Sequence, residues 1–352
     1  MTLKYGILPR MSEKLIGVCV IGSGRAGMIH ARNFARVVPG ARLAALVDPQ
    51  AEALAAAGRE LGVDRLFSDY RQALADKDVH AVVVVTPTKF HRDIVVAAAA
   101  AGKHILCEKP MAMTVEECQA MNRAVAGARV VLQLGFMRRF DAGFQAAREA
   151  IDRGDIGPVV QVKSLTHGPS VPQPWMYDLK ASNGPLAEVN SHDIDTLRWF
   201  TGSDFQEVYA IGGNYRCPEA RERYPDFYDN VSLLARFRNG MQGFIGGAVS
   251  VGYGYDSRVE VLGTRGILLV GRQEQHATVT CTPRGDIVRP FVKSWRNLFL
   301  EAYAEEDREF VRAVAEQKPP RVNGEDGMMA VQVVEAGNRS IREGRPITLP
   351  QL

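Results

Sequence analysis

The sequence predicts an α/β fold in two domains: a doubly wound parallel sheet, followed by an α+β domain with a large, mostly antiparallel sheet. In the first part, short apolar runs alternate with helical patterns, which is typical of βαβ units around a parallel sheet. After Phe136, strand-like segments joined by tight turns dominate. The chain has 352 residues, more than one hydrophobic core usually serves, so two domains are expected on length alone.

The change of pattern sets the expected boundaries. Residues 15–137 are predicted to form the first domain and residues 138–352 the second, while residues 1–14 are an N-terminal extension to which we assign no function. In the first domain, strands are expected over 15–21, 43–47, 81–85, 104–107 and 130–134, and helices over 24–37, 49–61, 91–101 and 114–125. Pro49 suits the first turn of its helix, and Thr114 can cap the last one.

The second domain is expected to begin with a helix over 140–153, ended by Gly154. Strands follow over 159–165, 207–212, 231–237, 241–251, 258–263, 266–270 and 277–282, with helices over 185–201, 299–316 and 324–343. Turn sequences such as Asn239-Gly240 favour antiparallel hairpins. One face of so large a sheet needs a cover, so we expect a partner subunit to cover it in a homo-oligomer.

Composition excludes several classes of protein. Lys and Arg total 43 against 40 Asp and Glu, with no basic cluster, so no nucleic-acid partner is expected. The first residues lack a signal peptide and no apolar stretch is long enough to span a membrane, which predicts a cytoplasmic protein. The five cysteines are scattered, without disulfide or zinc-ligand spacing, and no HExxH occurs, so no metal is expected.

A glycine-rich motif, Gly22-Ser23-Gly24-Arg25-Ala26-Gly27, follows the first predicted strand and opens a helix. In that context the first glycine permits a tight turn, the second lets the backbone approach a pyrophosphate, and the third allows close helix–strand packing. The helix N-terminus then offers free N–H groups to the phosphates. A purely structural turn is the alternative. The motif predicts a Rossmann domain that binds a dinucleotide.

Further residues at strand ends complete the expected cofactor site. Asp48 ends the second strand, about 20 residues after Gly27, where a carboxylate accepts hydrogen bonds from ribose hydroxyls and repels a 2′-phosphate. NAD is therefore expected and NADP is disfavoured, although Asp48 can also act as a helix cap. Residues Thr86, Pro87, Thr88, His91, Glu108 and Lys109 follow the third and fourth strands and are assigned to the same site, His91 with a structural role as its alternative.

Three side chains are candidates for catalysis, namely Lys109, His192 and Glu188. Lys109 lies in Glu108-Lys109-Pro110 at a strand end that faces the cofactor, and Pro110 is a candidate for a cis bond; a surface lysine is the alternative. His192 can accept a hydroxyl proton near neutral pH, although a helical histidine is often only structural. Glu188 and Asp195 are spaced to share a helix face with His192 and would orient it. Hydride transfer from an alcohol needs a base such as His192 to take the hydroxyl proton.

These motifs, together with Gly135-Phe-Met-Arg-Arg-Phe-Asp141, Tyr253-Gly-Tyr-Asp256 and Gly324-Glu-Asp-Gly327, resemble the glucose–fructose oxidoreductase/inositol dehydrogenase/rhizopine catabolism oxidoreductase family, especially its inositol 2-dehydrogenase branch. The resemblance covers most of residues 15–349. It implies that Lys109 binds the reacting hydroxyl, that His192 is the acid–base, and that residues of the second domain bind the substrate. The substrate residues it implies are Lys109, Met137, Arg138, His167, Glu188, His192, Asp195 and Tyr255.

Two departures bear on the substrate. The family's inositol enzymes usually carry Asp where this chain has Glu188, and His167-Gly168-Pro169 replaces a more polar His-Arg-Asn-Pro. We therefore expect an NAD-dependent dehydrogenase that oxidises a ring hydroxyl of myo-inositol or a related cyclitol or sugar. The alternatives are a sugar, anhydrosugar or glycoside dehydrogenase, a non-catalytic sugar-sensing regulator that binds NAD, and a glycosidase that oxidises its substrate transiently with NAD.

Overall fold

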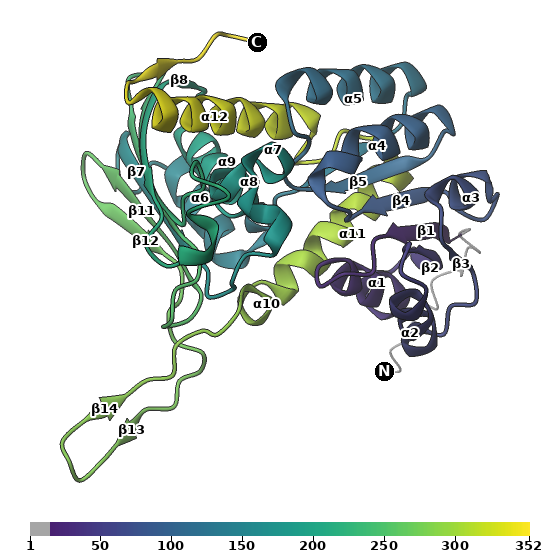
Figure 1. The fold of residues 1–352 in the computed structure, drawn as a ribbon, viewed down its shortest axis with the longest axis horizontal. Helices are drawn as coiled ribbons and strands as arrows, with labels where there is room; N and C mark the ends of the chain where they lie inside the picture. Colours follow the sequence, from purple (N-terminus) through teal and green to yellow (C-terminus); the bar gives the residue numbers. More distant parts are fainter. Residues whose placement is uncertain (1–14) are drawn as a thin grey trace, which may run out of the picture.

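The computed structural model describes residues 15–352, and the predicted extension over residues 1–14 lies outside the described residues. Figure 1 shows two lobes, one built around each of two sheets, with the C-terminal helices running between them. Within residues 15–352, no helix combines the length and the apolarity that crossing a membrane requires. The predicted Rossmann domain followed by an α+β domain is confirmed. The boundary at residue 137 stays a prediction.

The first lobe contains a parallel sheet in the order β3-β2-β1-β4-β5-β6. Its strands are β1 (Ile16–Ile21), β2 (Ala41–Val47), β3 (Leu66–Phe67), β4 (Ala81–Val84), β5 (His104–Glu108) and β6 (Leu132–Gly135). The central strands are buried on both faces, which is why they read as continuous apolar runs. The order reverses between β1 and β4, the place where open α/β sheets bind ligands.

Helices cover both faces of this sheet. The helices form two groups, and each group packs on the sheet through its own hydrophobic cluster. One face is covered by α1 (Gly27–Arg36), α2 (Ala51–Leu61) and α11 (Leu300–Glu316), and the other by α3 (Tyr70–Ala75), α4 (His91–Ala100) and α5 (Val115–Ala128). Thr114 caps α5 as predicted. Helix α2 begins two residues after Pro49, so the predicted position of Pro49 in its first turn is wrong. The short elements β3 and α3 were not predicted.

The second lobe contains a seven-stranded sheet in the order β12-β11-β7-β10-β9-β8-β15. The strands are β7 (Val159–His167), β8 (Phe205–Gly213), β9 (Asn230–Phe237), β10 (Gln242–Ala248), β11 (Asp256–Gly263), β12 (Ile267–Val270) and β15 (Ile347–Thr348). All neighbours are antiparallel except β7 and β10. The predicted Asn239-Gly240 turn joins the antiparallel pair β9 and β10.

Helices cover only one face of this sheet. They include α6 (Ala142–Asp152), α8 (Gly184–Glu188), α9 (Ser191–Thr201) and α12 (Gly324–Glu343), preceded by a short α7 (Leu179–Ser182). The single helix predicted over 185–201 is two helices. The helix is interrupted at Val189–Asn190, where the Asn190 side chain donates a hydrogen bond to Asp193. On the other face, apolar side chains are exposed, among them Ile211, Leu234 and Leu269.

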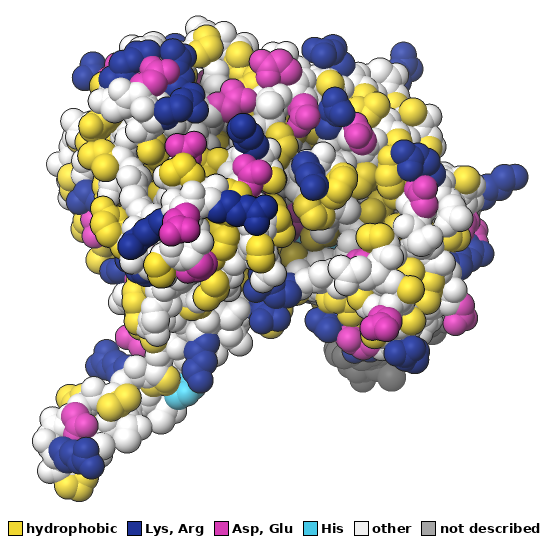
Figure 2. All heavy atoms as spheres, in the orientation of Figure 1, with side chains coloured by type: hydrophobic (Ala, Val, Ile, Leu, Met, Phe, Trp, Pro, Cys, Tyr) yellow, Lys and Arg dark blue, Asp and Glu magenta, His cyan; other side chains and the backbone are white. Residues whose placement is uncertain are grey.

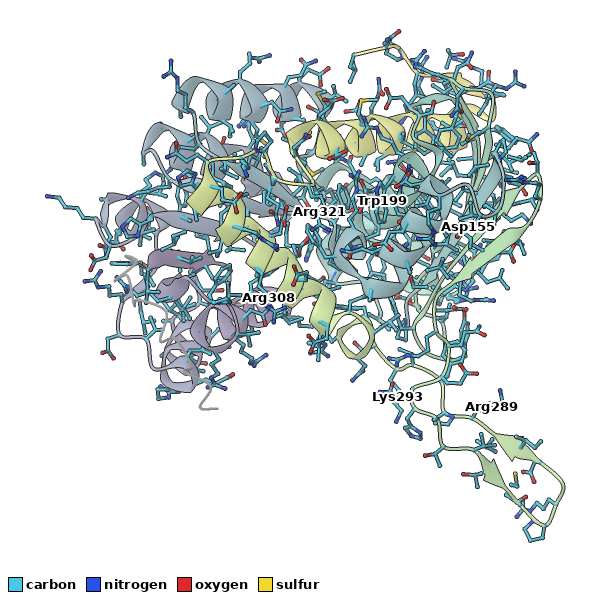
Figure 3. The ribbon with its side chains drawn as sticks, turned by 180° about the vertical axis from the view of Figure 1, so that it is seen from behind. Asp155, Trp199, Arg289, Lys293, Arg308 and Arg321 are labelled. Atoms are coloured by element: carbon cyan, nitrogen blue, oxygen red, sulfur yellow. The ribbon has the colours of Figure 1, made fainter. Side chains whose placement is uncertain are left out.

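Helix α11 returns from the second lobe to the first and joins the two (Figure 1). It follows the short α10 (Trp295–Leu298) and packs on α1, where Asp307 accepts hydrogen bonds from His30 and Asn33. Figure 3 labels Arg308 on this helix, where it pairs with Glu305. On the opposite side α12 packs on α5, and Glu335 accepts a hydrogen bond from the Val115 amide. The lobes are therefore clamped from two sides.

A hairpin arm, residues 271–293, projects from the second lobe (Figure 1). It holds β13 (Thr280–Cys281) and β14 (Ile287–Val288), which form a separate two-stranded sheet. The strand predicted over 277–282 is therefore not part of the large sheet, and only two of its residues are extended and paired. Figure 3 shows Arg289 on the arm and Lys293 at its base.

A buried ion-pair network fixes α9 against α12. Arg139 lies in the turn before α6, and its guanidinium contacts Asp195 at 2.6 Å and Asp326 at 2.9 Å. Arg198 also pairs with Asp326 at 2.6 Å. Asp195 is almost fully buried, and burial raises its pKa although Arg139 opposes the shift. The network holds together elements that are far apart in sequence.

We predict that Arg139→Leu lowers the free energy of unfolding by about 3–5 kcal/mol, because it leaves the Asp195 carboxylate buried without its partner. Arg153→Leu is the matched control: its partners Asp155 and Glu149 are exposed, and loss of a surface pair costs at most about 1 kcal/mol. Urea denaturation of both variants measures the difference. Equal midpoints for the two variants would contradict this role of Arg139.

Candidate active site

A cavity of about 420 Å³ lies where the two lobes meet. In Figure 2 the surface is hollowed between them. The first domain contributes the glycine loop, the ends of β4 and β5, and Met137; the second contributes the loop after β7, the α8–α9 junction and parts of α10 and α11. The lining residues are Gly24, Arg25, Ala26, Gly27, Val85, Thr86, Pro87, Thr88, Glu108, Lys109, Met137, Thr166, Gly168, Pro169, Ser170, Val171, Pro172, Trp175, Met176, Glu188, Val189, His192, Val249, Tyr255, Trp295 and Tyr303.

The glycine loop has the geometry that a dinucleotide requires. Gly22 has a φ of 107°, a conformation that side chains disfavour. A Cβ on Gly27 would lie 1.8 Å from the Gly22 carbonyl oxygen, so close packing excludes any other residue there. Gly24 has open space around it, and no side chain caps the start of α1. A pyrophosphate can therefore approach both the Gly24 backbone and the free N–H groups of the helix.

Asp48 lies beside the glycine loop at the end of β2. Its carboxylate accepts hydrogen bonds from the backbone N–H groups of Ser23, at 2.7 Å, and Gln50, at 2.9 Å. These contacts fix its orientation and leave lone pairs for ribose hydroxyls. No side chain of Pro49 or Gln50 carries the positive charge that a 2′-phosphate needs. The residues present therefore fit NAD.

The end of β4 is tied to the end of β5 by His91. Its buried ring lies between two backbone carbonyls, with Nε2 2.8 Å from Thr86 O and Nδ1 2.9 Å from Pro110 O. His91 is not among the residues that line the cavity, and its contacts are those of the structural alternative, while a contact with the cofactor stays a prediction. The Lys109–Pro110 bond is cis, as the sequence suggested.

Lys109 reaches across the lobe boundary. Its Nζ donates a hydrogen bond of 2.7 Å to the backbone oxygen of Glu188 at the end of α8. Glu108 supports the lysine from behind, since its Oε2 accepts the Lys109 amide at 3.0 Å. The ammonium is thus held at the junction of the two lobes and lines the cavity.

His192 lies in the first turn of α9 and lines the same cavity. Burial lowers its pKa well below the usual value, and the positive charges of Lys109 and Arg138 lower it further. Phe136 packs edge-on against the ring at 5.9 Å. Within residues 15–352, the buried Nδ1 has no hydrogen-bond partner. Burial and the neighbouring positive charges therefore favour the neutral imidazole, which is the form that accepts a proton.

The two acids expected to orient His192 make other contacts. Glu188 belongs to α8, not to the helix of His192; it lines the cavity, and its Oε1 lies 3.5 Å from the Thr88 hydroxyl. Burial raises the Glu188 pKa, while Lys109 opposes the shift. Asp195 pairs with Arg139 and is not among the lining residues. The prediction that Glu188 shares a helix with His192 is therefore wrong, whereas Asp195 does share α9 with His192 and holds Arg139.

The four remaining predicted substrate residues divide into two groups. Met137 and Tyr255 line the cavity. Arg138 is buried behind it, where it pairs with Asp193 at 2.9 Å and contacts the Thr166 hydroxyl at 2.6 Å, so it supports a lining residue without reaching the cavity. His167 bonds to the hydroxyl of Tyr253 and also lies outside the lining.

A buried polar cluster lies behind Glu108. His30 Nε2 is 3.2 Å from Glu108 and Nδ1 is 2.7 Å from Asp307, so the ring joins β5 to α11. Although burial opposes it, the two carboxylates raise the His30 pKa well above its usual value. Glu306 lies close by, with no hydrogen bond to its carboxyl group among the described residues, and burial and Glu108 raise its pKa. The cluster fixes Glu108 and therefore the backbone of Lys109.

Sequence reasoning did not identify several lining residues. Tyr303 comes from α11, and the loop after β7 contributes Trp175 and Met176. Two of the chain's three tryptophans, Trp175 and Trp295, line the cavity, whereas Trp199, labelled in Figure 3, packs on Arg139. The clustering of tryptophan and proline just after His167 was the only available signal.

Comparison with known proteins agrees with this geometry. Residues 16–136 match the oxidoreductase family with an NAD-binding Rossmann fold, and residues 148–349 match the C-terminal alpha/beta domain of that oxidoreductase family. The chain belongs to this family. The fold around the glycine loop and Asp48 is accordingly an NAD-binding Rossmann domain, and the protein is an NAD-dependent oxidoreductase.

Several relatives match over nearly their whole length. Myo-inositol 2-dehydrogenase of Thermotoga maritima is 32% identical, over 95% of this chain and 98% of that protein. The NAD-dependent scyllo-inositol 2-dehydrogenase of Bacillus subtilis is also 32% identical, over 96% and 97%. The structure of scyllo-inositol dehydrogenase from Lactobacillus casei with bound NAD(H) and scyllo-inositol superposes with a TM-score of 0.87, at 27% identity, over 95% and 99% of the two chains.

Two glycine variants separate binding from folding. Gly24→Ala should leave the unfolding temperature of the NAD-free protein unchanged, since its Cβ meets no atom, and should weaken NAD binding at least about tenfold by blocking the pyrophosphate. Gly27→Ala should instead destabilise the NAD-free protein by about 1–3 kcal/mol. Thermal unfolding and NAD titration measure both. Wild-type NAD affinity in Gly24→Ala would contradict the assigned cofactor position.

Proposed function

We propose that this protein is an NAD-dependent dehydrogenase that oxidises a ring hydroxyl of myo-inositol or a related cyclitol to the ketone. One observation carries the proposal. Lys109 from the first domain and His192 from the second line the same cavity, next to the glycine loop. Removing a proton and a hydride from a carbinol requires a base and a polarising group at one point beside the nicotinamide, and these two side chains can supply both.

The roles of the side chains follow from their charges. When bound, NAD supplies the acceptor for the hydride that leaves the carbinol carbon. The Lys109 ammonium would donate a hydrogen bond to the substrate oxygen and stabilise negative charge on it as the proton leaves. His192, held neutral by its surroundings, would accept that hydroxyl proton. Glu188 would accept a hydrogen bond from a neighbouring hydroxyl, and its charge lies close to Lys109.

The relatives support a cyclitol as the substrate. The proteins from Thermotoga maritima and Bacillus subtilis are named as myo-inositol and scyllo-inositol 2-dehydrogenases, and the Lactobacillus casei structure holds scyllo-inositol. A neutral sugar, as its pyranose, anhydrosugar or glycoside, is the second candidate. The observation that favours it is that Gly168 and Pro169 offer the cavity no polar side chain, which leaves Ser170 as the one polar side chain of this loop in the lining.

The exposed face of the large sheet supports association of two copies. Ile211, Leu234 and Leu269 are each more than half exposed on that face, which is unusual for a protein that acts alone. The proposed assembly is a homo-oligomer, a dimer or a tetramer, formed by these sheets. A cytoplasmic location is also a proposal.

The function is tested by mixing the protein with NAD and each of myo-inositol, scyllo-inositol, glucose, xylose and levoglucosan, and measuring NADH absorbance. We expect NADH with at least one cyclitol, and loss of turnover by about a thousandfold in Lys109→Met with NAD binding retained. Turnover of a pyranose without any cyclitol would select the second candidate. Binding of NAD with no NADH from any of the five would indicate a non-catalytic regulator.

The pH profile tests the role of His192. Because its pKa is lowered, His192 stays neutral as the pH falls through 6.5, and the acid limb of kcat/KM should lie below pH 6.5. His192→Asn should lower kcat by about a hundredfold to ten-thousandfold and abolish that limb. The measurement is kcat/KM for oxidation between pH 4.5 and 9. An unchanged profile in His192→Asn would refute the assignment.

A further inference from the structure

The cavity is lined by two chemically different sets of side chains. Around the proposed reaction centre lie Lys109, Glu188, His192 and Tyr255, all able to form hydrogen bonds. The loop after β7 and helix α10 contribute a second set that we call the apolar wall: Pro169, Val171, Pro172, Trp175, Met176 and Trp295. Ser170 is the one polar side chain that this loop adds to the lining, and the wall contains no ionisable group.

The apolar wall is preformed. Backbone hydrogen bonds tie its loop to the neighbouring strand: the Gly168 amide donates to the Ala248 oxygen at 2.8 Å, and the Val251 amide donates to the Gly168 oxygen at 3.2 Å. Pro169, Pro172 and Pro174 restrict the backbone between these ties and Trp175. A ligand would therefore meet these side chains without the entropic cost of ordering them.

The wall keeps apolar surface in contact with water. Val171 is 63% exposed and Trp175 is 39% exposed, although both line the cavity. Trp295 packs on Tyr303, with ring centroids 5.7 Å apart, and this contact continues the wall to the reaction centre. Exposed apolar surface at a cavity marks a surface that is covered when the ligand binds.

A free cyclitol would gain little binding free energy from contact with the apolar wall. It carries a hydroxyl group on every ring carbon, and a hydroxyl moved from water against proline, valine and tryptophan loses hydrogen bonds that these side chains do not replace. A charged substituent such as a phosphate would also lack a partner there, because the wall has no cation. A neutral apolar group fits both conditions.

We infer that the substrate is a cyclitol or sugar ring that carries a neutral apolar substituent, such as an aryl or alkyl ether or glycoside. The ring reaches Lys109 and His192, and the substituent covers Val171, Trp175 and Trp295. This inference rests on the proposed function and names its substrate class. The oxidation itself is unchanged: the hydroxyl proton goes to His192 and the hydride to NAD.

The test compares two pairs of neutral substrates. One pair is myo-inositol and its monobenzyl ethers, each regioisomer in turn, and the other is methyl and phenyl β-D-glucopyranoside. NADH formation gives kcat/KM for each compound. In at least one pair we expect the aryl member to exceed the other by about tenfold or more, which is the gain from covering a modest apolar area.

Variants of the wall test the assignment to these residues. Trp175→Ala and Val171→Ser remove apolar surface from exposed positions, so folding should be unaffected, and circular dichroism checks this. Each should reduce the ratio of the two kcat/KM values by about fivefold. The control is Val37→Ala, which removes an exposed apolar side chain at the end of α1, outside the lining, and should leave the ratio unchanged.

The outcomes are distinguishable. If no member of either pair yields NADH, the proposed function fails, and the inference fails with it. If the unsubstituted members are oxidised as well as their aryl partners in both pairs, the dehydrogenase chemistry stands and the inference is overturned. An aryl preference that survives intact in both wall variants also overturns the assignment to Val171 and Trp175.

Discussion

The hydrogen bond from Lys109 Nζ to the Glu188 backbone oxygen, 2.7 Å long, joins the end of a parallel strand in one domain to the end of a helix in the other. The proposed chemistry depends on this contact, because it brings the ammonium to the side of the cavity where His192 begins the next helix. The nearby Lys109 also bears on the electrostatics of the site, because burial and then the positive charge of Lys109 lower the pKa of His192 and favour its neutral form. A base and a hydrogen-bond donor thus coexist without neutralising each other.

Such a contact requires that the two domains hold a fixed relation. Helix α11 supplies it on one side, because His30 bridges Glu108 in the first domain and Asp307 on that helix. Helix α12 supplies it on the other, because it packs on α5 and its Glu335 accepts a hydrogen bond from the Val115 amide. The contacts of His30 with Glu108 and Asp307 are buried, and hydrogen bonds to charged groups are short and geometrically specific. They set the distance between the domains, while the glycine loop and Asp48 remain open to NAD.

The sequence was informative where local chemistry decides the structure. Buried parallel strands, the turn at Gly22 and the placement of Asp48 and Lys109 at strand ends all have short-range signals. It was misleading where tertiary contacts decide. Helical spacing joined Glu188 to His192, yet Asn190 breaks the helix to bond Asp193, and Asp195 pairs with Arg139. The apolar wall and Tyr303 have no periodic pattern, because a loop and a distant helix supply them.

The account is tested most directly by a crystal structure of the protein with NADH and its best substrate. It predicts that Lys109 Nζ and the His192 imidazole both lie within hydrogen-bond distance of one substrate hydroxyl, whose carbon faces the nicotinamide. A bound ring whose carbinol nearest the nicotinamide contacts neither side chain, or contacts only one domain, would contradict the central claim that the two domains meet around a single reacting oxygen.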